Sequence, residues 1–253
     1  MLVRRIAFLA TFLAAWFALD RMAASPPMPV PAALALGVAL LILATGEILA
    51  FGANPRTVLL TLGYGRPDGR AIVLALIVGA AVILGYLAGA AVLGIQLDLR
   101  PNWPLVLVGA LLFHGLAEES VWRGFVYRHL REGRTFGRAV LVTIPFIALT
   151  HVPIIASNGW LVGALALLTA AVTCVPLAYL WDRGRTTVWA PAIVHGMVGA
   201  WQLFDRTYPV TFSVVVMVVT LTVPLLVFPI GRRLFSRTSA EAGPAVAVAS
   251  PAS

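Results

Sequence analysis

The chain has 253 residues, of which 60% are hydrophobic and only 11% are charged. A soluble domain of this length carries about 25% charged residues, so the composition excludes an ordinary soluble protein. The formal charge of +8 does not indicate a nucleic-acid-binding protein, because the basic residues, all of them arginines, are scattered through short segments and form no patch. We therefore expect no nucleic-acid partner.

Long uncharged apolar runs follow one another along the chain, separated by short segments rich in Gly, Pro and Arg. About 20 apolar residues are enough for a helix to cross the bilayer core, and the runs lack the alternation of membrane strands. The sequence thus predicts an all-α fold, a polytopic bundle of about eight transmembrane helices. The expected spans are residues 4–20, 29–53, 71–95, 103–128, 139–156, 160–181, 187–204 and 210–230.

Arginine placement predicts the direction of these spans. With a cytoplasmic N-terminus, the cytoplasmic segments hold 15 of the 18 arginines. This bias predicts a multi-pass plasma-membrane protein with both termini in the cytoplasm. The first span is expected to stay as an anchor, although Arg4 and Arg5 before an apolar stretch also resemble a secretory signal. Residues 1–235 form one transmembrane domain in this interpretation, and residues 236–253 form a disordered cytoplasmic tail.

Several ionisable side chains lie well inside the predicted spans, where a charge costs about 2.5–3.5 kcal/mol. Such side chains usually face the interior of a bundle, pair with one another and mark function. The sequence therefore predicts a polar site within the membrane domain. Its candidate residues are Glu47, His114, Glu118, Glu119, Arg123, His151 and His195.

Helical spacing divides the central cluster into two pairs. Glu119 and Arg123 are four residues apart with the acid first, which favours an ion pair that holds the carboxylate in place. His114 and Glu118 have the same spacing, so the imidazole can hydrogen-bond to the carboxylate. Because Glu118 lies about 100° around an α-helix from Glu119, we expect different roles: Glu118 works and Glu119 braces.

One free carboxylate and two imidazoles in a dry cavity can activate water for hydrolysis. Glu118 can act as a general base, and His151 or His195 can orient water or donate to an oxyanion. Peptide-bond hydrolysis needs these groups. A proton-coupled transporter uses the same residue types, with Glu47 as a further relay group, so the residues alone leave both functions open.

Three motifs in chain order resemble those of the CPBP family of intramembrane proteases, the CAAX-protease and bacteriocin-processing or Abi family. "EESVWRGFVYRHL" (118–130) resembles the EExxxR motif. "IALTH" (147–151) resembles FxxxH with isoleucine in place of phenylalanine, and "HGMVG" (195–199) resembles HxxxN with glycine in place of asparagine. The resemblance covers roughly residues 100–205, and the family also contains the eukaryotic type II CAAX prenyl endopeptidase.

The resemblance implies an intramembrane endopeptidase in which Glu118 is the general base and His151 helps it to activate water. His195 would stabilise the oxyanion, and Glu119 and Arg123 would support the site. Gly199 offers no side-chain donor, and losing one such donor can lower a rate about 10²–10³-fold. Gln202 lies about 10 Å further along the helix by rise, too far for a simple replacement. The glycine therefore motivates an alternative, an inactive immunity or scaffold protein.

The resemblance also bears on cofactors and partners. A zinc or other divalent ion is conceivable, with Glu118, His151 and His195 as ligands, but a ligating Glu118 would leave no base, so we expect no cofactor. The expected partners are the lipid bilayer and a membrane-anchored peptide or protein, prenylated in the family's eukaryotic branch. By rise, Glu118 and His151 differ in depth by about 10 Å, so shared chemistry requires a tilted fifth helix or a segment 123–130 that is partly sunk in the bilayer.

Overall fold

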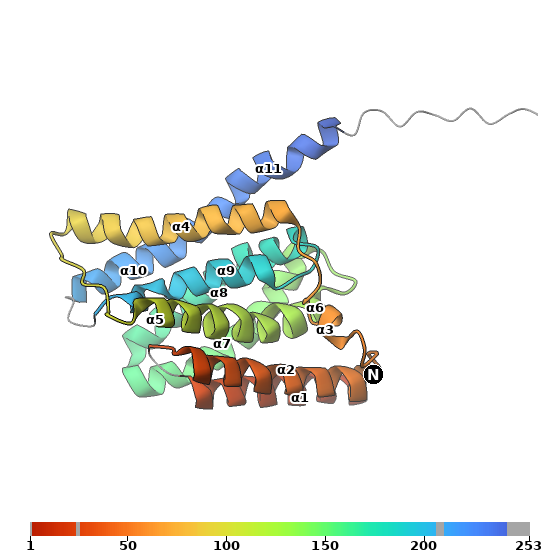
Figure 1. Ribbon diagram of the computed structural model, residues 1–253. Coiled ribbons are helices and arrows are strands. Elements are labelled where there is room, and N and C mark those ends of the chain that lie inside the picture. The colour runs from red at the N-terminus through yellow and green to blue at the C-terminus, as the bar shows by residue number, and fades with distance from the viewer. Residues whose placement is uncertain (1, 24–25, 206–209, 242–253) are drawn as a thin grey trace, which may run out of the picture.

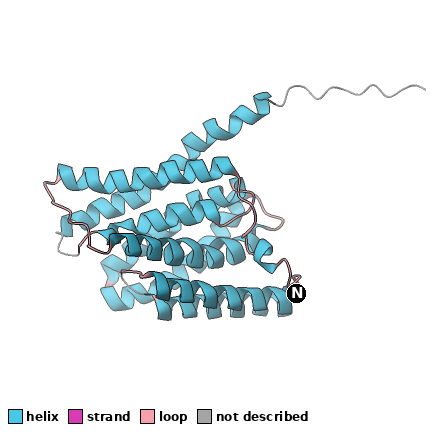
Figure 2. Ribbon diagram, in the orientation of Figure 1, coloured by secondary structure: helices cyan, strands magenta, loops and turns pink. Residues whose placement is uncertain are grey.

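The computed structural model describes residues 2–23, 26–205 and 210–241. Helices make up these ranges, with one isolated bridge between Leu99 and Phe204 and no strand in the described chain (Figure 2). The predicted all-α bundle is confirmed. The elements are α1 (Leu2–Met22), α2 (Pro29–Phe51), α3 (Val58–Thr61), α4 (Gly69–Val92), α5 (Trp103–Ala110), η1 (Leu111–Ala117), η2 (Ser120–Tyr127), α6 (Arg128–Arg131), α7 (Phe136–Asn158), α8 (Trp160–Arg183), α9 (Trp189–Val198), η3 (Gly199–Leu203), α10 (Val210–Thr222), η4 (Val223–Leu226) and α11 (Val227–Glu241).

Seven helices in the described ranges are long and apolar enough to cross a membrane, one fewer than the expected eight spans. The chain is an integral membrane protein. The exception is the expected span 187–204, which is the 10-residue α9 followed by the 3₁₀ segment η3. The segment formed by α9 and η3 still connects the two ends of the bundle. The amide of Val188 donates to the Gly63 carbonyl at one end (3.0 Å), and the amide of Arg100 donates to the Leu203 carbonyl at the other (2.9 Å).

Helix α9 occupies the middle of the molecule, between α4 on one side and the α5–η1 helix on the other, whereas α1 and α2 lie together beyond that helix (Figure 1). A helix in this position is surrounded by other helices. It can therefore be shorter than the bilayer is thick, because its ends meet protein and loops. Its central place brings residues of the third motif against the first.

Local signals in the sequence set the ends of the long helices. Gly52 ends α2 in the left-handed conformation (φ 75°), where a side chain would be strained. The Asp68 side chain accepts a hydrogen bond from the Arg70 amide and caps α4. Gly159, with φ 84°, turns the chain between α7 and α8. These turns fold the apolar runs into antiparallel neighbours.

Aromatic side chains of α1 pack against the helix that carries the first motif. The Phe8 ring stacks on Phe125 with centroids 5.4 Å apart, and the Phe12 ring lies 5.6 Å from Trp122. Helix α1 is therefore part of the hydrophobic core. At the other terminus, α11 projects away from the bundle and continues to Glu241, so the expected tail boundary at residue 236 lies within a helix (Figure 1). Residues 242–253 of the predicted tail lie outside the described residues.

Candidate active site

The two adjacent glutamates lie at the junction of two π-helical segments. Segment η1 ends at Ala117, η2 begins at Ser120, and Glu118 and Glu119 occupy the two positions between them. A π-helix has i to i+5 hydrogen bonds and a wider turn than an α-helix, and such turns are frequent at functional sites. The first-motif helix therefore departs from α-helical geometry on both sides of its acidic pair.

Two glycines let α9 approach this helix closely. An ideal Cβ on Gly115 would lie 2.7 Å from the backbone oxygen of Ala192, and one on Gly196 would lie 2.8 Å from Leu111 Cδ2. Small residues at helix interfaces in membranes allow backbones to come together in this way. The close contact places the third-motif His195 beside the acidic pair.

Tyr64, in the loop before α4, connects the acidic helix with the start of α9. The Ser120 hydroxyl donates to the Leu116 carbonyl (2.6 Å), so the Tyr64 hydroxyl is the donor in its 2.6 Å bond with Ser120 Oγ. Burial raises the pKa of Tyr64 to about 12, which keeps this donor protonated. The Tyr64 ring meets Trp189 edge-on with centroids 5.5 Å apart.

The ion pair expected from helical spacing is present. A guanidinium nitrogen of Arg123 donates to Glu119 Oε1 at 2.8 Å, and the side chains are 3% and 0% exposed. A buried charge without a partner would be strongly unfavourable, so each group is held by the other.

Glu119 has a second partner that the spacing does not reveal. His195 Nδ1 lies 2.6 Å from the same Oε1 atom and donates to it, whereas Oε2 makes no hydrogen bond within the described residues. A carboxylate bonded to one ring nitrogen fixes the orientation of an imidazole and leaves the other nitrogen for chemistry. Because the two residues are 76 positions apart, helical periodicity carries no signal of this contact.

Glu118 lies between two imidazoles. His114 Nδ1 donates to its Oε1 atom at 2.9 Å, as the spacing predicted, and His195 Nε2 lies 3.5 Å from its Oε2 atom. The side chain is 23% exposed, in contrast to the fully enclosed Glu119. The two glutamates therefore differ in access: one carboxylate faces open space and the other is locked in the protein.

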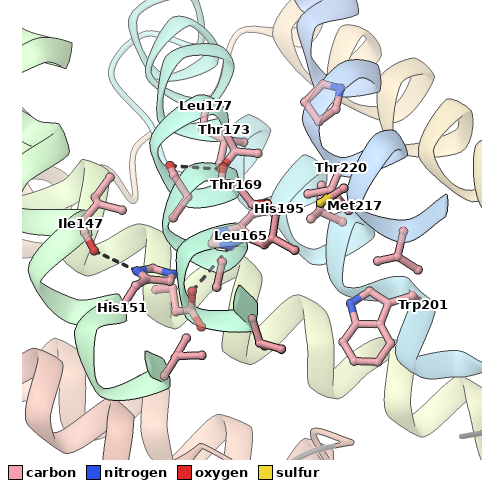
Figure 3. Close-up of a pocket in the computed structure, with 18 of the residues that line it drawn as sticks. Ile147, His151, Leu165, Thr169, Thr173, Leu177, His195, Trp201, Met217 and Thr220 are labelled. Carbon is pink, nitrogen blue, oxygen red and sulfur yellow. Dashed lines mark hydrogen bonds and ion pairs between the residues drawn. The ribbon is translucent and has the colours of Figure 1, made fainter. Parts of the chain in front are cut away.

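His151 faces the same open space from α7. Its Nδ1 donates to the Ile147 carbonyl (2.8 Å), so in the neutral ring Nε2 is the acceptor. Figure 3 shows His151 on α7 at the left, His195 near the centre of the view, and Trp201 and Met217 at the right. Glu118, His151 and His195 line one cavity, so the predicted depth difference does not keep them apart.

The cavity has a volume of about 690 Å³ and lies among α7, α8, α9 and α10. Apart from the catalytic candidates and Arg123, its walls are mostly aliphatic, with a few hydroxyl groups. Ligand sites are typically concave, mostly apolar and furnished with a few converging polar groups. This cavity fits an apolar ligand whose reacting atoms lie next to Glu118. Residues of the wall include Leu161, Leu165, Thr169, Thr173, Leu177 and Met217.

Residues 100–201 match the family model described as type II CAAX prenyl endopeptidase Rce1-like. The match supports the resemblance of this part of the chain to the CAAX protease (CPBP) family. The match begins just before α5 and includes all three motifs, ending two residues after Gly199. A comparison with curated proteins gave no match. The CAAX protease family is a family of proteases, so the match supports a protease at this coarse level.

The metal ligands that the CAAX protease resemblance implied do not form a ligand set. Within the described residues, no three His, Cys, Asp or Glu side chains lie close enough together to hold a metal ion. The arrangement does not fit a metal centre, and we derive no catalytic step through one.

Glu47 lies outside the cavity. It is 1% exposed in α2, forms an ion pair with Arg128 and lies 2.8 Å from His129 Nε2. The His129 ring is packed against Phe51 and Phe125, with centroid distances of 4.3 and 4.8 Å. This second polar cluster connects α2 to the end of the first-motif helix. Its partners neutralise Glu47, so the residue joins helices and does not line the cavity that Glu118 lines.

The close contact between α9 and η1 yields a stability prediction. Gly115→Ala is expected to lower the free energy of unfolding by about 1–3 kcal/mol, because the added methyl group would meet the Ala192 backbone, which cannot move aside freely. Gly37→Ala is the matched control, since nothing lies within 4 Å of that position. Thermal unfolding in detergent measures both variants, and equal melting temperatures would contradict the contact.

Proposed function

We propose that the protein is an intramembrane endopeptidase that hydrolyses a peptide bond of a membrane-associated substrate with water activated by Glu118 and His151. The observation that carries the proposal is the convergence of Glu118, His151 and His195, from three separate helices, on one apolar cavity. The family of the central segment supports the same reaction class. The arginine bias supports a plasma-membrane location with both termini cytoplasmic.

The proposed reaction begins with a water held between Glu118 Oε2 and His151 Nε2. Glu118 takes a proton as the water oxygen bonds to the scissile carbonyl carbon, and the carbonyl oxygen becomes an oxyanion. Glu118 then passes that proton to the leaving amide nitrogen as the carbon–nitrogen bond breaks. The second proton of the water stays on the new carboxyl group, so the products are a carboxylic acid and an amine, and no proton or electron is left over.

His195 is the proposed donor to the oxyanion. Glu119 accepts a hydrogen bond from its Nδ1, so His195 donates from Nε2 as the doubly protonated ring, and that second proton points toward the region beside Glu118 Oε2, 3.5 Å away. A donor fixed before the reaction stabilises developing charge without reorganisation. The buried Arg123–Glu119–His195 chain thus supports the oxyanion side of the site, and His114 supports Glu118 on the base side.

The substrate class follows from the walls of the cavity. An apolar lining between α7, α8, α9 and α10 suits a lipid-modified or membrane-inserted peptide better than a polar soluble one. We propose a membrane-anchored peptide or protein, with a prenylated tail as one form of anchor. The mechanism needs no metal cofactor and no nucleic-acid partner.

The test is cleavage of a panel of membrane-anchored peptides, prenylated and unmodified, by purified protein in proteoliposomes. Wild type is expected to cleave at least one peptide, and His151→Ala is expected to do so about 10²-fold more slowly, because the water loses one of its two holding groups. Glu132→Gln is the control, since that carboxylate is 68% exposed and lies outside the cavity. Mass spectrometry of the products locates the cleaved bond.

Two outcomes would contradict the proposal. No cleavage of any peptide by any form would favour the alternative that Gly199 suggests, an inactive protein that acts as a scaffold or in immunity. Equal cleavage by wild type and His151→Ala would remove the histidine from the mechanism. A proton-coupled transporter finds less support, because Glu47 is paired with Arg128 and His129 and does not line the cavity.

A further inference from the structure

Gly199 and Gln202 stand three residues apart in η3, and both lie beside His114. In a 3₁₀-helix the side chains at i and i+3 eclipse one another, so the two positions share one face. An ideal Cβ on Gly199 would lie 3.1 Å from His114 Cδ2 and 3.8 Å from Gln202 Nε2. The Gln202 amide therefore lies over the glycine, close to where a side chain at position 199 would begin.

Helical rise predicts that Gln202 is too far away for a simple replacement of the motif asparagine, and its observed partner is a different group of the site. Gln202 is 7% exposed, and its amide nitrogen donates to His114 Nε2 at 3.2 Å. His114 Nδ1 in turn donates to Glu118 Oε1 at 2.9 Å. Helical rise does not reveal this contact, because it measures distance along one axis from His195, whereas the amide meets an imidazole that projects from another helix.

The segment that carries Gln202 is fixed at its end. Arg100 donates from its side-chain Nε to the Gln202 carbonyl (3.0 Å) and from its amide to the Leu203 carbonyl (2.9 Å). The Asp205 amide donates to the Asp98 carbonyl (2.9 Å). These bonds join η3 to the chain just before α5, the helix that continues into His114. Both partners of the Gln202–His114 bond thus stand on connected backbone.

We propose that Gln202 is a positioning residue of the active site, which holds Glu118 through His114, and that Gly199 is the residue that makes room for it. The inference rests on the proposed function, because it assigns a purpose to the orientation of Glu118. The hydrogen bonds run from the Gln202 amide to His114 Nε2 and from His114 Nδ1–H to Glu118 Oε1. An imidazole with an acceptor on one nitrogen and a donor on the other has a single tautomer and a fixed ring.

The pair therefore explains the departure from the third motif. An asparagine at position 199 would compete with the Gln202 amide for the same space and press on the His114 ring. We expect Gly199→Asn to lower kcat/KM about tenfold, although it restores the family's usual residue. An increase in activity in this variant would contradict the proposal.

The direct test is ¹⁵N NMR of the histidine rings in detergent, since the chain has only four histidines. In wild type, His114 is expected to show a protonated Nδ1 and an unprotonated, hydrogen-bonded Nε2. Gln202→Met removes the amide at similar volume and is expected to shift the Nε2 signal. Gln202→Glu keeps the length and replaces the donor with an acceptor, so the ring is expected to protonate Nε2. Gln96→Met, at an exposed glutamine, is the control.

Activity then separates the two proposals. Gln202→Met is expected to lower kcat/KM about tenfold, the value of one hydrogen bond, and to change the shape of the pH–rate profile. Unchanged His114 signals in both Gln202 variants would overturn the positioning role. Shifted signals with wild-type kcat/KM would overturn it as well. If the signals shift and no form of the protein cleaves any peptide, the contact stands and the proposed hydrolysis is what fails.

Discussion

Glu118→Gln is expected to abolish most peptide cleavage while leaving the fold intact. The amide cannot accept the proton of the attacking water, and loss of a general base typically costs about 10²–10⁴ in rate. The glutamine oxygen can still accept the hydrogen bond from His114, and the side chain is partly exposed to the cavity, so packing is kept. The kcat/KM of purified variant and wild type on the same peptide, with thermal unfolding of both, checks this result.

Comparing cleavage with the melting temperature in this variant distinguishes a catalytic role of Glu118 from a structural one. A melting temperature within about 2 °C of wild type, together with lost cleavage, assigns Glu118 to the chemistry. Wild-type cleavage in Glu118→Gln would show that another group takes the proton. A large fall in melting temperature would show that Glu118 is a structural residue, and the loss of activity would then say nothing about a base.

Much of the fold follows from hydropathy and turn residues. The helices that end at Gly52 and before Gly159 stop at local signals, a glycine with positive φ in each case, and the expected spans end within a few residues of them. The Glu119–Arg123 and His114–Glu118 contacts were also predictable, because helical neighbours four residues apart meet in space. Features that depend only on residues close together in the sequence could therefore be predicted from it.

The remaining features depend on tertiary contacts. Helix α9 has only 10 residues, too few to cross a bilayer, and it can be this short because it lies inside the bundle. Hydropathy alone does not distinguish such a helix from a full span. The bond from His195 to Glu119 joins segments 76 residues apart. The contact of Gln202 with His114 depends on a 3₁₀ turn after α9 and on an imidazole from another helix, so α-helical rise does not reveal it.

These long-range contacts change the role of the second glutamate. Spacing assigned Glu119 to Arg123 alone, as a passive brace. In the structure one oxygen atom, Oε1, accepts hydrogen bonds from both the guanidinium and His195 Nδ1, so the same carboxylate neutralises a buried charge and orients the ring of His195. In the proposed mechanism stability and catalysis therefore depend on the same atom, and we expect a single substitution there to affect both.

Glu119→Ala is accordingly expected to lower the free energy of unfolding by about 3–5 kcal/mol. It leaves Arg123, 3% exposed, as a buried charge without its carboxylate, and removal of one partner of a buried pair has an effect of this size. Cleavage is expected to be lost as well, because His195 loses the bond that orients it. Thermal or denaturant unfolding in detergent measures the first effect and kcat/KM the second. A melting temperature equal to that of wild type would contradict the burial of the pair.

A double variant distinguishes the two roles of Glu119. Replacing a buried ion pair with apolar residues of similar volume is often neutral or stabilising, so Glu119→Leu combined with Arg123→Met is expected to recover most of the lost stability. Cleavage is expected to stay at the level of Glu119→Ala, because leucine cannot accept a hydrogen bond from His195 Nδ1. If activity returned together with stability, Glu119 would be a structural residue only. If stability returns and activity does not, the carboxylate acts on the reaction through the imidazole that it holds.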